Sequence, residues 1–271
     1  MHGLPADDRV TPLADPVAEA RRLIELAGER GLVLRALGGV AVCLQAPGGE
    51  PRLPRRVKDI DLAAVKGTHK ATIKVMLEAG YVADEMFNAL RGSRRLLFGD
   101  PVNGRHLDVF VGEFAMCHDI PLTARLDSQQ LTVPVDELLL TKLQIVQMTE
   151  NDQNDIYNIV FHNSVESARR RHEPQSARVR HAEKISAAFI AALCAADWGL
   201  WRTCMLNIER CLANLDTSEL DASERALVAG SLTSVRDRIE AEPKPLKWRM
   251  RNQVGDRVRW YNEPEEEAAG T

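Results

Sequence analysis

The chain has 271 residues, of which 45% are hydrophobic and 27% are charged, a balance typical of folded globular proteins. Its length suits one large domain or two modest ones. The net charge of −4 excludes a surface that is basic all over, as a general nucleic-acid-coating protein needs. A local basic patch remains compatible with it.

Cysteine usage and the N-terminal sequence predict the compartment. Five cysteines lack the paired short spacing of a zinc site, and their odd number predicts free buried thiols in a reducing cytosol. No apolar signal-peptide core occurs in residues 1–10. The longest apolar run, Ile185 to Ala196, is too short to span a bilayer. We therefore expect a cytoplasmic protein, whose oligomeric state the sequence does not indicate.

The first elements in chain order are a loose segment and a helix. Residues 1–14 contain prolines and acidic residues and are expected to be loose. A helix is expected to start at Asp15–Pro16, because proline suits a first turn, and to run to Gly28 with apolar residues at helical spacing.

A glycine pair follows the next short strand. Leu32–Leu37 has strand composition, and Val40–Gln45 reads as an apolar helix, with Gly38 and Gly39 between them. Such a junction lets the backbone approach a phosphate and offers amide donors at a helix N-terminus. Gly38 and Gly39 are therefore candidate nucleotide-binding residues.

The loop from Pro47 to Pro54 is rich in glycine and proline and predicts a mobile flap. Arg52, Arg55 and Arg56 lie in or beside it. One interpretation is a solvated loop. In the other, Arg55 or Arg56 contacts phosphate.

Aspartates alternate with apolar residues over two expected strands. In the strand Val57–Ala64, Asp59 and Asp61 are two residues apart and project to the same face. A helix over Thr68–Ala79 and a strand over Arg94–Phe98 come next. A turn at Asp100–Gly104 then leads into the strand that carries Asp108. So short a link requires an antiparallel pair, and the series predicts a mixed α/β sheet flanked by helices.

Three carboxylates converge if the aspartate-bearing strands are neighbours. Asp59, Asp61 and Asp108 would then lie within a few ångströms, where like charges raise each other's pKa. A hard divalent cation resolves this conflict, and Mg²⁺ prefers a few carboxylates together with phosphate oxygens. The sequence thus predicts a Mg²⁺ or Mn²⁺ site at these three residues.

Two later features have competing interpretations. Cys117–His118 could suggest a metal ligand or a nucleophile, but adjacent residues rarely bind one metal, which favours a structural role. Lys142 lies on a helix expected over Glu137–Met148 and capped by Asp136, and it is the only Lys or Arg between Leu131 and Asn163. It is either a surface lysine of an amphipathic helix or a functional one.

The C-terminal part reads as helical. Residues 15–163 form the first expected domain, and 164–181 are polar and basic and predict a linker. A small helical domain over 182–243 contains helices at Lys184–Ala196, Trp198–Leu215 and Ala222–Glu240, with Asp197 and Ser223 as caps.

The tail, residues 244–271, combines cations with aromatic residues. Six Lys and Arg residues stand against Asp256 between Lys244 and Trp260, with Trp248 and Trp260 interleaved. Such a segment suits phosphates and stacked bases. It suits equally a segment that docks on the protein's own surface.

The order of these motifs resembles the nucleotidyltransferase superfamily, which has the fold of polymerase beta and of the aminoglycoside nucleotidyltransferases. The most similar branch is AbiEii-like and MenT-like, which includes toxins of toxin–antitoxin systems. It has Gly–Gly where others have Gly–Ser, followed by an Arg-x-Thr-x-Asp-Ile-Asp segment. Arg55, Lys58 and Asp59–Asp61 match that segment, and Val57 stands at the threonine position. The resemblance covers residues 30–162, and the C-terminal part is similar to uncharacterised bacterial proteins that carry the same first domain.

The resemblance implies a nucleotide substrate and assigns further residues. It implies that Lys142 reaches the nucleotide phosphates and that an aspartate of the next helix, Asp152 or Asp155, supports it. The expected reaction attacks the α-phosphate of a nucleoside triphosphate. Two metal ions are held by Asp59, Asp61 and Asp108, and Asp108 also takes the acceptor's proton.

The acceptor hydroxyl could belong to RNA or tRNA, which the tail favours, or to a protein or a small molecule. Two other functions remain open. One is a nucleotide-binding regulator without turnover, and the other is an antitoxin-like interaction protein.

Overall fold

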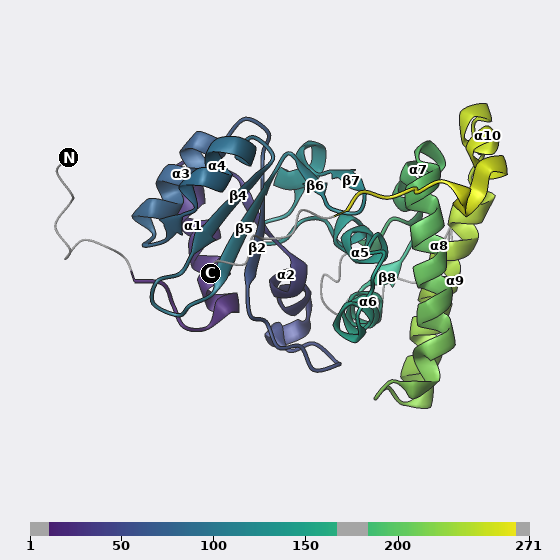
Figure 1. Cartoon of the computed structure of the whole chain (residues 1–271). Coiled ribbons are helices and arrows are strands. Elements are labelled where there is room, and N and C mark those ends of the chain that lie inside the picture. Colours follow the sequence, from purple (N-terminus) through teal and green to yellow (C-terminus); the bar gives the residue numbers. More distant parts are fainter. Residues whose placement is uncertain (1–10, 167–183, 264–271) are drawn as a thin grey trace. The chain divides into compact units, whose positions relative to one another are not determined.

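The computed structural model describes residues 11–166 and 184–263 (Figure 1). These residues divide into two compact units. The first comprises residues 11–50, 55–115 and 119–134, and the second comprises 51–54, 116–118, 135–166 and 184–263. The sequence suggests that the first domain extends to residue 163, whereas the structure groups the segment after residue 134 with the C-terminal helices. The expected linker lies outside the described residues except at 164–166, as do residues 1–10 of the N-terminal segment and 264–271 of the tail.

A five-stranded mixed sheet is the framework of the first unit. Its strands in spatial order are β1 (Leu34–Leu37), β2 (Ile60–Ala64), β5 (His106–Val111), β4 (Arg95–Gly99) and β3 (Val82–Ala83). β2 and β5 are parallel, and the other neighbours are antiparallel. This confirms the predicted mixed α/β sheet and the predicted antiparallel pairing of β4 with β5.

The two faces of this sheet differ in chemistry, because successive strand residues point to opposite faces. One face is apolar and fully buried. Helices α1 (Pro16–Glu29) and α3 (His69–Glu78) contact each other and strands of the sheet (Figure 1). That face includes Ile60, Leu62, Leu107 and Val109. The alternate positions carry Asp61, Asp108 and Arg95. Burial of the apolar face therefore fixes which side the carboxylates occupy.

The local sequence signals hold at the start of the chain. The Asp15 carboxylate accepts from the Ala18 backbone N–H at 2.7 Å, with Pro16 in the first turn of α1. α2 (Gly38–Gln45) follows β1 without an intervening loop. β2 begins at Ile60 and not at Val57, so Asp59 precedes the strand.

Several short elements of the first unit were not predicted from the sequence. α4 (Glu85–Arg91) is capped by Asp84, and Asn88 pairs with both backbone groups of Leu97 on β4. A small hairpin joins β6 (Glu113–Ala115) to β7 (Asp119–Pro121). Short 3₁₀ turns occupy Pro47–Gly49 and Thr123–Ser128. These segments lack the long apolar periodicity on which sequence reasoning depends.

The second unit is mainly helical, as predicted. Its helices are α5 (Val135–Leu143), α6 (Glu150–His162), α7 (Ala187–Ala196), α8 (Trp198–Asn214), α9 (Ala222–Ala241) and α10 (Leu246–Val254), and a two-residue parallel pair joins β8 (Ser164–Val165) to β9 (Lys184–Ile185). Asp197 caps α8 as predicted.

Two helix starts differ from the prediction. α9 is capped by Asp221 and not by Ser223, because Asp221 and Glu224 form a reciprocal capping box. α5 starts at Val135, so Asp136 lies in its first turn instead of capping it.

The predicted mobile flap is wrong for residues 51–54. The Asn158 side chain accepts from the Leu53 N–H at 2.8 Å and donates to the Leu53 carbonyl at 3.1 Å. Arg52 forms an ion pair with Glu224 at 2.6 Å, and its backbone N–H donates to His162 Nε2 at 3.1 Å. Partners more than 100 residues away in sequence therefore fix a loop whose composition alone suggests mobility.

Within residues 11–166 and 184–263, no helix combines the length and the apolar character that a membrane crossing requires.

Candidate functional site

Two of the predicted carboxylates lie side by side on the polar face of the sheet. Asp61 on β2 and Asp108 on β5 are register partners. Neighbouring strands are about 4.8 Å apart, and the two residues project to the same side. Asp108 is buried and Asp61 is half-buried. The sheet therefore brings together the two residues that the sequence places on different strands.

The glycine pair lies directly against this carboxylate row. Gly38 has a φ of 58°, and a Cβ atom there would lie 1.9 Å from Asp61 Oδ2. A side chain at this position is therefore excluded by both conformation and space. Because α2 begins at Gly38, its first backbone N–H groups have no partner within the helix and are available as donors beside Asp61.

Arg55 completes this part of the site. A Cβ atom on Gly39 would lie 2.6 Å from Arg55 Nη2, so the guanidinium rests against the glycine backbone. Arg55 Nη1 donates to the Arg56 carbonyl at 2.6 Å. The structure thus places Gly38, Gly39, Arg55 and Asp61 together. Amide donors and a guanidinium at a helix N-terminus are suited to phosphate oxygens.

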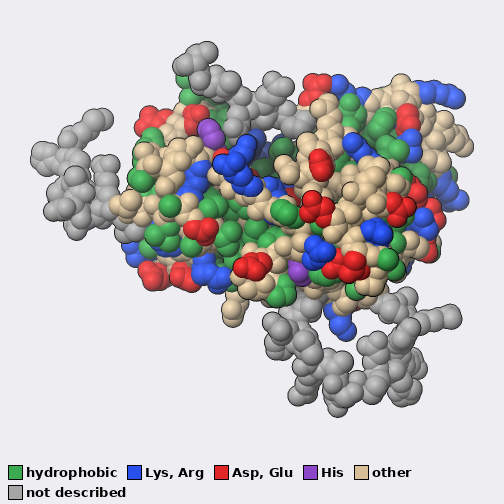
Figure 2. Space-filling model, turned by 90° about the horizontal axis from the view of Figure 1, so that it is seen from below, with side chains coloured by type: hydrophobic (Ala, Val, Ile, Leu, Met, Phe, Trp, Pro, Cys, Tyr) green, Lys and Arg blue, Asp and Glu red, His purple; other side chains and the backbone are tan. Residues whose placement is uncertain are grey.

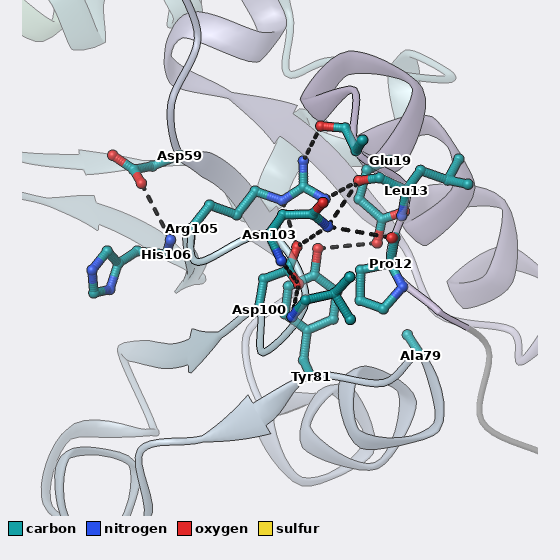
Figure 3. A network of polar contacts seen from close by, with 12 residues as sticks. Pro12, Leu13, Glu19, Asp59, Ala79, Tyr81, Asp100, Asn103, Arg105 and His106 are labelled. Carbon is teal, nitrogen blue, oxygen red and sulfur yellow. Dashed lines mark hydrogen bonds and ion pairs between the residues drawn. The ribbon is translucent and has the colours of Figure 1, made fainter. Parts of the chain in front are cut away.

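Asp59 has a different orientation from the one expected. It precedes β2, and its Oδ1 accepts from the His106 backbone N–H at 3.2 Å (Figure 3). His106 is two residues before Asp108 on β5. Asp59 therefore lies beside the start of β5, bonded to the strand that carries Asp108.

A network of polar contacts supports that end of β5 (Figure 3). Arg105 pairs with Asp100 at 2.8 Å and donates to the Leu13 and Ala14 carbonyls. Tyr81 donates to the buried Glu19 carboxylate at 3.0 Å, and burial together with that carboxylate raises the pKa of the Tyr81 hydroxyl. The network ties the β4–β5 turn to the segment before α1 and so fixes the backbone that holds Asp59.

Asp108 has a cationic partner that the sequence analysis missed. Arg95 Nε donates to Asp108 Oδ1 at 2.6 Å, and the two side chains are 13% and 7% exposed. The Arg95 guanidinium carbon lies 5.8 Å and 5.3 Å from the ring centroids of Phe87 and Phe110. Strand alternation places Arg95 on the face of Asp108 once the β4–β5 pairing is known. The alternation is visible in the sequence, but the β4–β5 register that brings Arg95 to Asp108 is not.

The carboxylates at this site are of the type that binds a divalent cation, but as they are oriented in the structure they do not form a complete metal site. Carboxylate oxygens on adjacent strands beside a helix N-terminus are hard ligands of the kind that Mg²⁺ and Mn²⁺ prefer. Among the described residues, no three His, Cys, Asp or Glu side chains lie close enough together to hold a metal ion. Asp59 is bonded to His106 and Asp108 to Arg95. The sequence predicts that three carboxylates converge. In the structure Asp61 and Asp108 are neighbours on adjacent strands, and Asp59 does not join them.

Lys142 lies in the second unit and has the partners that the sequence analysis named. Its ammonium is 2.8 Å from Asp155 Oδ2 and 3.4 Å from Asp152 Oδ1. Burial raises the pKa of Asp152, but the Lys142 charge and hydrogen bonds from Thr149 outweigh it, so the pKa lies below its usual value. Lys142 is buried. A surface lysine is therefore the wrong interpretation, and both aspartates support the ammonium.

Cys117–His118 has structural contacts. His118 Nε2 shares a hydrogen bond with Thr203 Oγ1 at 2.9 Å, and the His118 N–H donates to the Gln144 side chain at 2.8 Å. Cys117 is a buried free thiol whose carbonyl accepts from the Asn262 N–H. These contacts join the 116–118 segment to α8 and to the tail.

The aromatic residues of the tail pack on the protein. Trp248 is 8% exposed and its indole donates to the Cys194 carbonyl at 3.1 Å, while the Trp260 indole donates to Thr203 at 3.1 Å. A Cβ atom on Gly199 would lie 2.3 Å from the Trp260 carbonyl oxygen, so the tail approaches α8 at a glycine. Trp248 is therefore not a surface on which a base can stack.

Charges of both signs alternate over the face seen in Figure 2, where blue and red side chains are interspersed. Exposed cations of the tail include Lys247, Arg249 and Arg257. Arg259 is paired with Glu263, and Arg202 with Asp256.

Comparisons with known proteins find similarity among solved structures, where five chains match. No protein-family model and no curated protein matches the chain. The chain is similar to the crystal structure of an antigenic nucleotidyltransferase-like protein from Paracoccidioides brasiliensis. The two are 15% identical, with 61% of this chain and 81% of that chain covered, at a TM-score of 0.36. So low a structural score carries no argument about activity.

Proposed function

We propose that this chain is a metal-dependent nucleotidyltransferase that moves a nucleoside monophosphate from a nucleoside triphosphate to a hydroxyl acceptor. One observation carries the proposal. Asp61 is held against Gly38, at the first turn of α2, and is the register partner of Asp108 on the next strand. A carboxylate pair beside free helix amides suits a metal-bound triphosphate.

The residues of the first unit have complementary roles in this proposal. The amides at the start of α2 and the Arg55 guanidinium bind triphosphate oxygens and offset the charge that develops on them. Asp59, Asp61 and Asp108 would hold Mg²⁺ or Mn²⁺, which supplies Lewis-acid stabilisation of the transferring phosphate when bound. In this proposal Asp108 would also accept the proton of the acceptor hydroxyl.

Lys142 is a proposal of a different kind. Its ion pairs with Asp155 and Asp152 hold its ammonium group in place. Its role as a triphosphate ligand rests on the resemblance to the AbiEii-like branch. Lys142→Met tests that role through its effect on triphosphate affinity.

The acceptor and the cellular role are finer proposals. With Trp248 packed inside the protein, the case for RNA or tRNA rests on the exposed cations of the tail, and a protein or a small molecule remains an equal alternative. A toxin function rests on the resemblance alone. It predicts that expression of the wild type, but not of Asp61→Asn, arrests growth.

Calorimetry tests the site directly. Each nucleoside triphosphate is titrated into the wild type and into Asp61→Asn, with Mg²⁺ and with a chelator. We expect Mg²⁺-dependent heat in the wild type and its loss in Asp61→Asn. A matched control is Asp237→Asn, which alters an exposed carboxylate of α9. Undetectable heats for the wild type under both conditions would exclude the nucleotide site.

A second candidate function has a specific observation in its favour. Asp59 and Asp108 are both bonded within the protein and do not form a group of three carboxylates with Asp61. A regulatory protein that binds a nucleotide and catalyses no transfer would have a nucleotide site with this incomplete carboxylate group. It predicts triphosphate binding with no transfer to any acceptor.

A further inference from the structure

The polar face of the sheet holds a buried cation, Arg95, to which the proposed reaction gives no role. Arg95 Nε is 2.6 Å from Asp108 Oδ1, and neither side chain is more than 13% exposed. In the register of β4 and β5, Arg95 is opposite Phe110, and Asp108 is opposite Leu97. Arg95 is therefore the diagonal neighbour of Asp108 on the same face, within reach of its carboxylate.

Aromatic rings hold this guanidinium in place. Its carbon lies within cation–π distance of Phe87 on α4 and of Phe110 on β5, and Phe110 packs on Phe114 with ring centroids 4.6 Å apart. Arg94, the preceding residue, provides a contrast. It pairs with Glu113 at 2.7 Å and with Asp119 at 3.3 Å, and its side chain is 55% exposed. Arg95 is built into the site, whereas Arg94 is a surface residue.

A metal ion and the Arg95 guanidinium would compete for the Asp108 carboxylate. The Asp108 carboxylate is almost fully buried and needs a positive partner, because an uncompensated buried charge is costly. Arg95 provides that partner in the structure. A divalent cation bound to the same carboxylate would place a second positive group a few ångströms from the guanidinium, and like charges repel strongly at that distance in a partly buried place.

We propose that Arg95 is the internal counter-cation of Asp108 and sets the affinity of the carboxylate site for divalent metal. It is a positioning residue, because it acts through Asp108. Arg95 keeps the site charge-balanced before metal enters and must release Asp108 when metal binds. The inference rests on the proposed metal site at Asp61 and Asp108.

Metal titration of the full chain tests this inference. Mn²⁺ alone is titrated calorimetrically into the wild type, Arg95→Met, Arg95→Lys, Asp108→Asn and the control Arg94→Met. If the pair is formed for about nine-tenths of the time, the competent fraction is about a tenth, and Arg95→Met binds Mn²⁺ about tenfold more tightly. Arg95→Lys gains less, and Arg94→Met matches the wild type. Arg95→Met combined with Asp108→Asn has no gain over Asp108→Asn.

Thermal unfolding is the second readout, independent of activity. Arg95→Met removes a cationic partner from a buried carboxylate, so its melting temperature in a chelator falls below that of the wild type. Mn²⁺ then raises the melting temperature of Arg95→Met by more than it raises that of the wild type, because ligand binding stabilises the folded state in proportion to its affinity.

Opposite results overturn the inference in distinguishable ways. If the wild type binds Mn²⁺ and Arg95→Met binds it equally or less tightly, Arg95 is an orienting support of Asp108 and not its competitor. If no variant binds Mn²⁺, the metal site itself fails, and the proposed function fails with it. If Arg95→Met does not fold, Arg95→Lys decides, because it retains the charge and still predicts a smaller gain in Mn²⁺ affinity.

Discussion

At the scale of single residues, Gly38 and Asp61 define the geometry of the candidate site. The positive φ of Gly38 and its contact with the Asp61 carboxylate leave no room for a side chain. Gly39 is less constrained, because its neighbour is the end of the flexible Arg55 side chain. The two glycines look equivalent in sequence and differ in what surrounds them.

Gly38→Ala is expected to destabilise the fold and abolish triphosphate binding. An alanine at this φ is strained by about 1–3 kcal/mol, and its Cβ must displace the Asp61 carboxylate. Gly28→Ala is the matched control, because nothing lies within 4 Å of a Cβ there and its backbone is ordinary. Chemical denaturation and nucleotide calorimetry measure both effects. Equal stability and unchanged affinity in the two variants would show that the Gly38 contact is unimportant.

The candidate site was predictable at this scale where residues are close in sequence. Asp61, Asp108, Gly38 and Gly39 follow from alternation and from a glycine pair at a strand–helix junction. The orientations of Asp59 and Asp108 were not predictable, because they depend on His106 N–H and Arg95 across the sheet. The spacing of residues along a strand determines which face of the sheet a side chain is on. It does not determine which residue of another strand that side chain contacts.

At the scale of elements, strands and long helices agree with their sequence patterns, and loops do not. The apolar face of the sheet explains why β2 and β5 were predictable. The 51–54 loop shows the opposite case, because its order comes from Asn158, Glu224 and His162 on distant helices. The glycine and proline content of a loop indicates its local backbone flexibility. It carries no information about hydrogen bonds and ion pairs from distant residues.

The contact between α6 and this loop predicts a pH dependence. Burial lowers the pKa of His162 from 6.5, and its Nε2 accepts the Arg52 N–H in the neutral form. Below pH 6.5 the unfolded chain therefore binds more protons at this residue than the folded chain. The stabilising contribution is present above pH 6.5 and is lost as the pH falls below that value.

Melting temperatures between pH 8 and pH 5 measure this contribution. His162→Gln retains an acceptor and does not titrate, so it is expected to lose less stability than the wild type as the pH falls through this range. All other histidines are the same in both proteins, so the difference between the two curves isolates His162. Parallel curves would assign the pH dependence elsewhere.

At the scale of the whole molecule, the described residues form a sheet-containing unit and a mainly helical unit whose segments alternate along the sequence. Residues 51–54 and 116–118 belong to the second unit although their flanks belong to the first. A linear sequence reading places domain boundaries at composition changes and does not detect such exchanges. In the described part of the predicted tail, residues 244–263, a helix and a turn pack on α7 and α8.

Packing of the tail yields a prediction that separates stability from RNA binding. Trp248→Ala removes a buried indole and its hydrogen bond to Cys194, and should lower the free energy of unfolding by about 3–5 kcal/mol. RNA affinity per folded molecule should not change. Lys247→Ala with Arg249→Ala alters exposed cations and should leave stability within about 0.5 kcal/mol.

A salt series of RNA binding completes that comparison. If the tail binds RNA, the double variant lowers the log–log slope by about 0.7 for each phosphate that it no longer neutralises. An unchanged slope and affinity would mean that the tail only docks on its own protein. The acceptor would then be a protein or a small molecule.

Nucleotidyl transfer at the Asp61–Asp108 site is best tested by following the fate of a labelled triphosphate. The protein is incubated with Mg²⁺, total RNA and protein extract, and each nucleoside triphosphate labelled at either the α- or the γ-phosphate. We predict that α-label enters one acceptor class while γ-label leaves as pyrophosphate, and that Asp61→Asn and Asp108→Asn transfer nothing. Transfer of γ-label, or α-label transfer that persists in both variants, would contradict the proposed reaction.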